Sequence, residues 1–223
     1  MAGFAGFDCF SFPGMAQMAW LQANTNLKWV CYYLAPAPSH LDASWMGKRG
    51  ALAAAGWGIG PMYVGQQVKG PGSHTVTGAQ GTLDGAGAAS LMTSEGFAPG
   101  RCVYLDLENG APFQFPQTDY VSAWVAAVAA AGFKPGIYCS HGIGAAVVTL
   151  CPSARIWAFN IPTTSLTTTS VLTYPTPDPP GSGVASANVW QRIQNTNIQL
   201  PGAPKPEMNV DLDTALTADP SAP

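Results

Sequence analysis

Short apolar runs alternate with segments of helical character along the chain. The apolar runs are rich in β-branched and aromatic residues and are bounded by Gly, Pro or polar residues, which is typical of buried β-strands. The predicted strands cover residues 4–10, 27–34, 57–64, 101–107, 134–139, 154–159, 188–193 and 208–212. Predicted helices lie between the first six strands, at residues 15–23, 41–55, 82–95, 118–131 and 143–150.

The last two predicted strands cannot bury their faces alone, so they complete the same sheet as the others. About eight strands with helical connections through the first five predict a (β/α)8 TIM-type barrel. Its strands are expected to be parallel, and some outer helices are expected to be missing or short near the C-terminus. A doubly wound open sheet is the alternative, but the strand-loop-strand ending fits it less well.

The helical signal ends after the sixth predicted strand. Residues 161–187 are rich in Thr, Pro, Ser and Gly, which resist regular structure. We therefore predict a long loop. Because it follows the carboxyl end of a strand, it is expected to border the active rim of the barrel.

The composition indicates one domain over residues 1–223. Hydrophobic residues make up 47% of the 223 residues and charged residues 9%, which suits a single sizeable core. The net charge is −3 without a run of Lys or Arg, which argues against a nucleic-acid-binding protein. The longest apolar stretches, such as 124–133, are shorter than the roughly 20 residues of a membrane span. We expect a soluble monomer.

The N-terminal residues show no basic region and no apolar signal core, and Asp8 is already acidic, so the chain as given carries no secretion signal. The five cysteines are an odd number, and four of them lie in strand-like runs as small buried hydrophobes would, so we expect mostly free thiols. No CxxC pair is present and the histidines are far apart in sequence: His40, His74 and His141. No metal site and no organic cofactor are predicted.

Two carboxylates end the fourth predicted strand. Asp106 and Glu108 are two residues apart, so in a β-strand they point the same way with Cα atoms roughly 6.6 Å apart. Such a pair can hydrolyse a glycosidic bond, because one group gives a proton while the other stabilises or activates the reacting centre. An acidic strand end that meets a solvated loop is the alternative interpretation.

Active sites of this barrel type lie at the carboxyl ends of the strands. Polar residues predicted at those ends are Asp8, Tyr32, Tyr33, Tyr63, Gln66, Asp106, Glu108, Tyr138, His141, Asn160, Gln191, Asp211 and Asp213. Any one of them also has a structural explanation: Asp8 could cap a turn, and Tyr138 could be core. Their joint position at one rim favours a polar cleft.

Several motifs resemble the glycoside hydrolase family 25 lysozymes, and more closely the family 25-like domain of unknown function that shares their barrel. The matching segments run along the whole chain: residues 6–13, 104–108, 136–138, 156–158, 190–191 and 210–213. The resemblance implies that Glu108 is the general acid and that Asp106 assists it. It also implies that Asp8 and Asp211 line the cleft. Two segments depart from the family pattern, Tyr32-Tyr33 in the second strand and Phe159-Asn160 at the end of the sixth.

The function expected from the residues and the resemblance is hydrolysis of a β-1,4 bond in an N-acetylated glycan such as peptidoglycan. The partner would be this polysaccharide, and the site of action extracellular or at the cell wall. The residues expected to bind or stack on sugar rings are Tyr33, Tyr63, Tyr138, Asn160, Trp190 and Gln191.

Two other classes remain open from the sequence. A non-catalytic glycan-binding barrel would keep the aromatic rim but hold its acids in salt bridges, for which Arg101, Arg155 or Arg192 are the candidate partners. A cysteine or serine hydrolase built on residues 139–141 is the weaker alternative. Adjacent strand residues face opposite ways, and the chain has no Gly-x-Ser-x-Gly turn.

Overall fold

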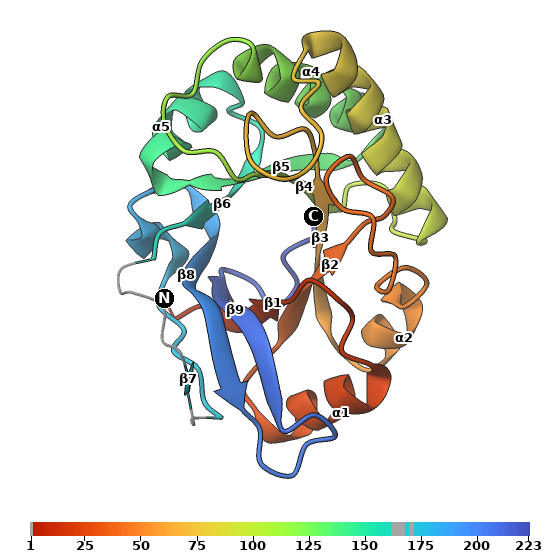
Figure 1. Ribbon diagram of the computed structural model, residues 1–223, viewed down its shortest axis with the longest axis vertical. Coiled ribbons are helices and arrows are strands. Elements are labelled where there is room, and N and C mark those ends of the chain that lie inside the picture. Colours follow the sequence, from red (N-terminus) through yellow and green to blue (C-terminus); the bar gives the residue numbers. More distant parts are fainter. Residues whose placement is uncertain (1, 162–167, 170–171) are drawn as a thin grey trace.

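Eight strands of the described chain close into a barrel (Figure 1). The computed structural model describes residues 2–161, 168–169 and 172–223. Around the barrel the strands are β1 (Phe4–Asp8), β2 (Trp29–Tyr33), β3 (Gly58–Val64), β4 (Cys102–Leu107), β5 (Lys134–Ser140), β6 (Arg155–Phe159), β8 (Ala187–Gln199) and β9 (Glu207–Ala215). Pairing of β6 with β8 and of β9 with β1 closes the ring, so the predicted barrel is confirmed and the open sheet is wrong.

Helices cover only part of the barrel. They are α1 (Met15–Asn24), α2 (Arg49–Ala54), α3 (Gly78–Ser94), α4 (Gln117–Ala130) and α5 (His141–Leu150). Figure 1 shows them outside β1 to β6, whereas no described α-helix covers β8 and β9. The prediction that outer helices are missing near the C-terminus is therefore confirmed. None of the described helices is both long and apolar enough to cross a membrane.

Helix α2 is much shorter than the predicted segment 41–55. Asp42 accepts a hydrogen bond from the Ser44 backbone N–H at 2.7 Å, and the Ser44 hydroxyl accepts one from the Phe12 N–H at 2.8 Å. The local Asp42 bond competes with helix formation, and the Ser44 bond ties the segment to a distant part of the chain. Residues 41–48 therefore form a loop with a turn at 44–47, which is fixed against the loop after β1.

The last strand runs opposite to its neighbours. β9 is antiparallel to both β8 and β1, so the expectation of parallel strands is wrong for β9. The physical reason is the short connection at 200–206, since a parallel crossover needs a dozen or more residues. Because of this direction, Asp211 lies level with Asp8 and Asp213 lies level with Gly6, one layer deeper in the barrel.

Strand β4 shows how alternation fills the barrel. Cys102 and Tyr104 belong to the interior cluster of the barrel, whereas Val103 and Leu105 pack in the outer layer under the helices. Large aromatic rings occupy the interior, with the centroids of Tyr104 and Trp157 5.4 Å apart. The next inward position along β4 is Asp106. The five cysteines are free, as expected from the sequence.

The segment 161–187 is only partly described, and residues 174–176 of it lie away from the active rim, contrary to expectation. The Tyr174 backbone N–H donates to the Asn26 side chain at 2.7 Å, and the Gly3 N–H donates to the Thr176 carbonyl at 2.8 Å. Asn26 and Gly3 precede strands β2 and β1, so these contacts lie at the N-terminal end of the barrel. The reason is that β8 is parallel to β6, which forces the connection to return to that end. The connection also includes β7 (Thr168–Thr169), which pairs with Asn197 and Ile198 of β8, and the 3-10 turn η1 (Pro179–Ser182), whose Ser182 carbonyl accepts a hydrogen bond from Asn160 after β6. These two elements lie towards the carboxyl end of the barrel.

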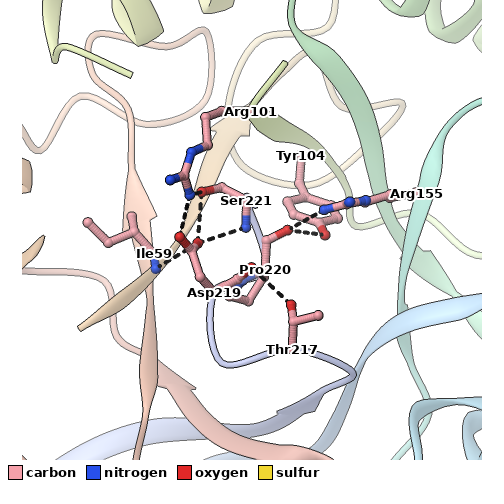
Figure 2. Close-up of polar contacts among 8 residues, drawn as sticks. All are labelled: Ile59, Arg101, Tyr104, Arg155, Thr217, Asp219, Pro220 and Ser221. Carbon is pink, nitrogen blue, oxygen red and sulfur yellow. Dashed lines mark hydrogen bonds and ion pairs between the residues drawn. The ribbon is translucent and has the colours of Figure 1, made fainter. Parts of the chain in front are cut away.

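The C-terminal tail covers the N-terminal end of the barrel. Figure 2 shows Asp219 surrounded by donors: it pairs with Arg101 and accepts hydrogen bonds from Ser221 and from the Ile59 backbone N–H. The Pro220 carbonyl accepts hydrogen bonds from the Tyr104 hydroxyl and from Arg155. The tail therefore ties β3, β4 and β6 together at the end opposite to the predicted active rim.

Candidate active site

A cleft opens at the carboxyl end of the barrel strands and contains the predicted acid pair. Its large lobe has a volume of about 550 Å³ and is lined by Asp106 and Glu108. A smaller hollow of about 190 Å³ is lined by Asp8 and Asp211. Phe10 and Tyr33 line both, so the two spaces adjoin. The structure therefore gathers the four acids named from the sequence at one rim.

Asp106 and Glu108 occupy different depths of the large lobe. Asp106 is the last inward residue of β4 and is buried, whereas Glu108 follows the strand and is exposed to the cleft. Burial raises the pKa of Glu108 above its usual value. Burial also raises the pKa of Asp106 well above its usual value, and the neighbouring charges of Glu108 and Asp8 raise it further. The pair is therefore disposed to keep a proton above the usual titration range of carboxyls.

The second pair, Asp8 and Asp211, is held by neutral donors. The Tyr33 hydroxyl donates to Asp8 at 3.0 Å, and the Asn195 backbone N–H donates to Asp211 at 2.7 Å. Gln191 donates to Asp211 through its amide nitrogen. Burial is the largest cause that raises both pKa values, well above the usual range for Asp8 and to about 6 for Asp211.

Two further sugar-binding candidates lie in this network. The Tyr138 hydroxyl donates to the amide oxygen of Gln191 at 2.5 Å, and Gln191 in turn contacts Asp211. Tyr138 and Gln191 therefore point into the barrel, as does Tyr33 through its bond to Asp8. The structure places these three side chains beside the acids.

Asp213 adds a fifth carboxyl one layer below the rim. One of its oxygens accepts a hydrogen bond from Trp157 Nε1 at 3.1 Å, whereas the other is buried without a hydrogen-bond partner among the described residues. Burial and the charges of Asp8 and Asp211 raise its pKa well above the usual value. An oxygen of Asp106 is likewise buried without a partner among the described residues.

The arginines that could neutralise these acids have other partners in the described structure. Arg101 pairs with Asp219 at the opposite end of the barrel, and Arg155 donates to the Pro220 carbonyl. The Arg192 guanidinium lies 5.4 Å from the centroid of the Trp190 ring. The salt bridges that would mark a non-catalytic barrel are therefore not formed by these arginines.

The amino-acid sequence matches a known family of glycoside-hydrolase-like domains. A sequence model of the family described as Rv2525c-like, glycoside hydrolase-like domain, matches residues 19–213. The chain belongs to this family. The resemblance to a glycoside-hydrolase-like domain related to family 25 is thus confirmed. No curated protein sequence matches the chain.

Solved structures share the barrel of this family at low sequence identity. The Tat-secreted protein Rv2525c of Mycobacterium tuberculosis is 13% identical, with 97% of each chain covered and a TM-score of 0.65. The spore cortex lytic enzyme SleM of Clostridium perfringens is 12% identical over 96% of this chain and 67% of its own, with a TM-score of 0.64. A family 25 glycosyl hydrolase of Bacillus anthracis is 13% identical over 97% and 90%, with a TM-score of 0.58. At such identities the likeness shows the fold alone.

Gln67 is a buried residue of this family member that the sequence reasoning missed. Its amide oxygen accepts hydrogen bonds from the Glu108 backbone N–H at 3.1 Å and from the Asn109 side chain at 3.3 Å. Its amide nitrogen donates to the Asp106 carbonyl at 3.0 Å. Gln67 therefore fixes the backbone that leads into Glu108 and the side chain of Asn109 that follows it. The sequence analysis named its neighbour Gln66 at the end of the third predicted strand. The Gln66 side chain instead donates a hydrogen bond to Asp84 on helix α3, outside the barrel.

A stack of three rings lines the cleft, and the sequence analysis named only Tyr33 of the three as a sugar-binding residue. The Phe10 ring lies edge-on to His40 with centroids 4.6 Å apart, and His40 stacks on Tyr33 at 4.7 Å. Phe10 keeps 63% of its surface exposed. Because the Tyr33 hydroxyl bonds to Asp8, the stack joins an exposed ring to a rim acid. The sequence did contain a sign of this role. Phe10 lies two residues after Asp8, and residues two apart in an extended segment point to the same side.

Three of the predicted sugar-binding residues lie outside the two lobes of the cleft. Tyr63 packs in the outer layer beside Trp124, 6.5 Å between centroids. Trp190 is buried and donates through Nε1 to the Asn160 carbonyl at 2.8 Å. The Asn160 amide donates to the Ser182 carbonyl at 2.7 Å and so anchors η1 to the end of β6. None of the three lines the cleft lobes.

The segment 139–141 does not form a nucleophilic site. Cys139 is buried in the outer layer, and burial raises its pKa to about 12. The Ser140 hydroxyl accepts a hydrogen bond from the Gly142 N–H and caps helix α5. His141 is exposed in the first turn of that helix. Among the described residues, no group of three or more His, Cys, Asp or Glu side chains is arranged to hold a metal ion.

Proposed function

We propose that this protein is a glycoside hydrolase that cleaves β-1,4 bonds in an N-acetylated glycan, with peptidoglycan as its substrate. The observation that carries the proposal is the convergence of Asp106 and Glu108 in one open cleft, with raised pKa values and no ion pair to a described basic residue. Carboxyls that keep a proton near neutral pH, without a structural counter-ion, are suited to acid catalysis.

Glu108 is the general acid in this proposal. It stands at the mouth of the cleft, where the oxygen of a bound glycosidic bond can reach it, and its raised pKa keeps the proton available. Donation of that proton to the leaving oxygen allows the bond to the anomeric carbon to break. Gln67 holds the backbone at Glu108 from beneath, which limits the movement of the acid.

Asp106 stabilises the positive charge that develops on the sugar or on its acetamido group. In the free protein, burial favours the neutral form of Asp106, so the proton of the pair is not confined to Glu108. An acetamido N–H donated to Asp106 favours its charged form. Substrate binding thus moves the proton of the pair towards Glu108, where the reaction requires it.

The remaining inward polar groups orient the substrate. Asp8 and Asp211 flank the smaller hollow, and Tyr33, Tyr138 and Gln191 hold the network around them. Hydroxyl and amide groups of this kind suit sugar hydroxyls, which need both donors and acceptors. The proposed substrate is a wall polymer and one structural neighbour is described as Tat-secreted, so we propose an extracellular or wall-associated site of action.

Digestion of purified peptidoglycan by the wild-type protein tests the proposal. New reducing ends, identified after borohydride reduction and mass analysis of the fragments, are expected between about pH 4 and pH 7. Neutral N-acetylglucosamine oligomers serve as a second N-acetylated substrate. If neither polymer gains reducing ends at any pH in this range, the hydrolase proposal fails and a glycan-binding role takes its place.

A further inference from the structure

Strand β8 is irregular where it passes the smaller hollow of the cleft, beside its neighbour β9 (Figure 1). Gln191 pairs with Asp213 of β9 and Thr196 pairs with Val210, so five residue steps on β8 oppose three on β9. The pairing shifts twice within this stretch. Extra residues in one strand leave backbone groups out of the ladder, and such bulges redirect groups towards active sites. We call residues 191–196 the β8 bulge.

Asn195 has an unusual backbone conformation within the β8 bulge. Its φ is +52°, and it is the one non-glycine residue of the described chain with a positive φ. This left-handed region is unfavourable for L-residues because Cβ approaches the backbone, although Asn tolerates it better than most. Such a conformation persists where surrounding contacts compensate for its cost, often at functional sites.

The contact that uses this conformation is a hydrogen bond to a rim acid. The Asn195 backbone N–H donates to one carboxylate oxygen of Asp211 at 2.7 Å. Gln191, at the other end of the β8 bulge, donates through its side-chain amide to the second oxygen. Asp211 is therefore held by one donor on each oxygen, and both donors come from the bulge. Asn195 and Asp211 also line the smaller hollow together with Asp8.

The other surroundings of Asp211 disfavour its negative charge. Burial is the largest cause that raises the pKa of Asp211, to about 6, and the Asn195 N–H is the largest cause that opposes this rise. The cation of the bulge, Arg192, lies over the Trp190 ring. The ionisable groups around Asp211 are all acidic: Asp8, Cys9, Tyr33, Glu108, Tyr138 and Asp213. The charge of Lys205, on the β8–β9 connection, acts on Cys9.

We propose that Asn195 is a positioning residue, whose left-handed backbone aims its N–H at Asp211 and holds that carboxylate as a hydrogen-bond acceptor towards the substrate. The effect on catalysis rests on the proposed hydrolase function, whereas the effect on Asp211 does not. The acting group is the backbone N–H in its left-handed conformation. The side-chain amide of Asn195 is not required.

A graded series at residue 195 tests the inference: Asn195→Gly, Asn195→Ala and Asn195→Val. Glycine adopts the left-handed conformation freely, alanine at a cost, and β-branched valine least well. The pKa of Asp211 is followed by carbon NMR of its carboxyl group, with Asp211→Asn to assign the signal. It should keep its wild-type value in Asn195→Gly and rise by about one unit in Asn195→Val, with Asn195→Ala between them.

Gln194→Val is the matched control. Gln194 is the exposed neighbour of Asn195 in the β8 bulge and is not among the described residues with a positive φ, so the pKa of Asp211 should not change. An equal rise in all three variants at residue 195 would assign the effect to the side-chain amide and overturn the inference. An unchanged pKa in Asn195→Val would also overturn it. If Asn195→Val does not fold, the milder Asn195→Ala decides between these outcomes.

Cleavage of peptidoglycan gives the catalytic readout. The kcat/KM of Asn195→Val should be about tenfold below that of the wild type near pH 5 and within about twofold near pH 8. The reason is that the ionised fraction of Asp211 differs most below both pKa values. A purely structural defect would lower the ratio equally at every pH, and that result contradicts the inference.

Failure of the proposed function gives a different pattern. A wild-type protein that cleaves no glycan, while the pKa of Asp211 follows the series at residue 195, refutes the hydrolase proposal and supports the role of Asn195 in holding Asp211. A wild-type protein that cleaves peptidoglycan, with no change in the pKa of Asp211 along the series, refutes only the role of Asn195.

Discussion

At the N-terminal end of the barrel, Asp219 pairs with Arg101 and accepts hydrogen bonds from Ser221 and a backbone amide (Figure 2). At the carboxyl end, Asp106 and Asp213 each keep a buried oxygen that has no hydrogen-bond partner among the described residues. The same type of side chain is thus satisfied at one end and left uncompensated at the other. The first arrangement stabilises the fold, whereas the second costs stability and keeps protons available for chemistry.

The largest expected effect comes from removing one rim acid. Asp106→Asn keeps the shape of the side chain but removes the charge that faces the developing cation. Turnover on peptidoglycan should fall by about two to four orders of magnitude while the melting temperature does not fall. A rate within threefold of the wild type would contradict the role of Asp106.

The opposite end should respond in stability instead of activity. Asp219→Ala removes the partner of Arg101 and an acceptor for the Ile59 amide, so the free energy of unfolding should fall by roughly 1–3 kcal/mol. Denaturant unfolding measures this change. The activity per folded molecule should stay unchanged, and a loss of activity without a loss of stability would remove the contrast between the two ends.

Asp213→Asn should increase stability at neutral pH. The pKa of Asp213 is raised in the folded state, so its protonated form stabilises the fold below the unfolded pKa of about 3.9, and this contribution is lost as pH rises through the folded pKa. An Asn side chain cannot ionise, so the variant does not lose this stability as the pH rises. Its amide oxygen can still accept the hydrogen bond from Trp157. The variant should gain about 1 kcal/mol or more near pH 8 and little near pH 4. Denaturant unfolding at the two pH values measures the gain, and an equal change at both would contradict the explanation.

The smallest expected effect is a shift of the pH profile. The charge of Asp8 is one of the causes that raise the pKa of Asp106, and Asp8→Asn removes it while leaving an acceptor for Tyr33. The acidic limb of kcat/KM should move to lower pH by up to about one unit. Asp219→Asn is the control and should leave the profile in place. A shift to higher pH in Asp8→Asn would contradict the electrostatic account.

Much of the fold could be predicted because strand and helix periods are local. The alternation through residues 101–107 correctly placed Asp106 on the inner face, together with the acid that follows it. The direction of β9 could not be read from alternation, which is the same for both directions. It depends on the length of the turn at 200–206. Helix α2 was overestimated because Asp42 accepts a hydrogen bond from the Ser44 backbone and Ser44 accepts one from the distant Phe12 backbone, which hold this segment in a non-helical form.

The candidate site was predicted where strand ends carry acids, but not where loops turn back into the cleft. Gln67 and Phe10 lie in such loops. The direction of their side chains depends on hydrogen bonds and ring contacts, which the periodicity of apolar residues does not predict. Trp190 shows an error that the sequence could have prevented. It is adjacent to Gln191, and neighbouring residues of one strand cannot both face the interior. The network with Tyr138 shows that Gln191 is the inward one.

The most direct test of the account compares wild-type and Glu108→Gln protein on peptidoglycan, with release of reducing ends and binding of the glycan measured on the same preparations. The wild type should be active, and Glu108→Gln should lose about two to four orders of magnitude in turnover while binding the glycan as before. His141→Ala, on the exposed start of α5, should change little. A wild-type protein that binds the glycan but releases no reducing ends, with binding unchanged in Glu108→Gln, would contradict the hydrolase account.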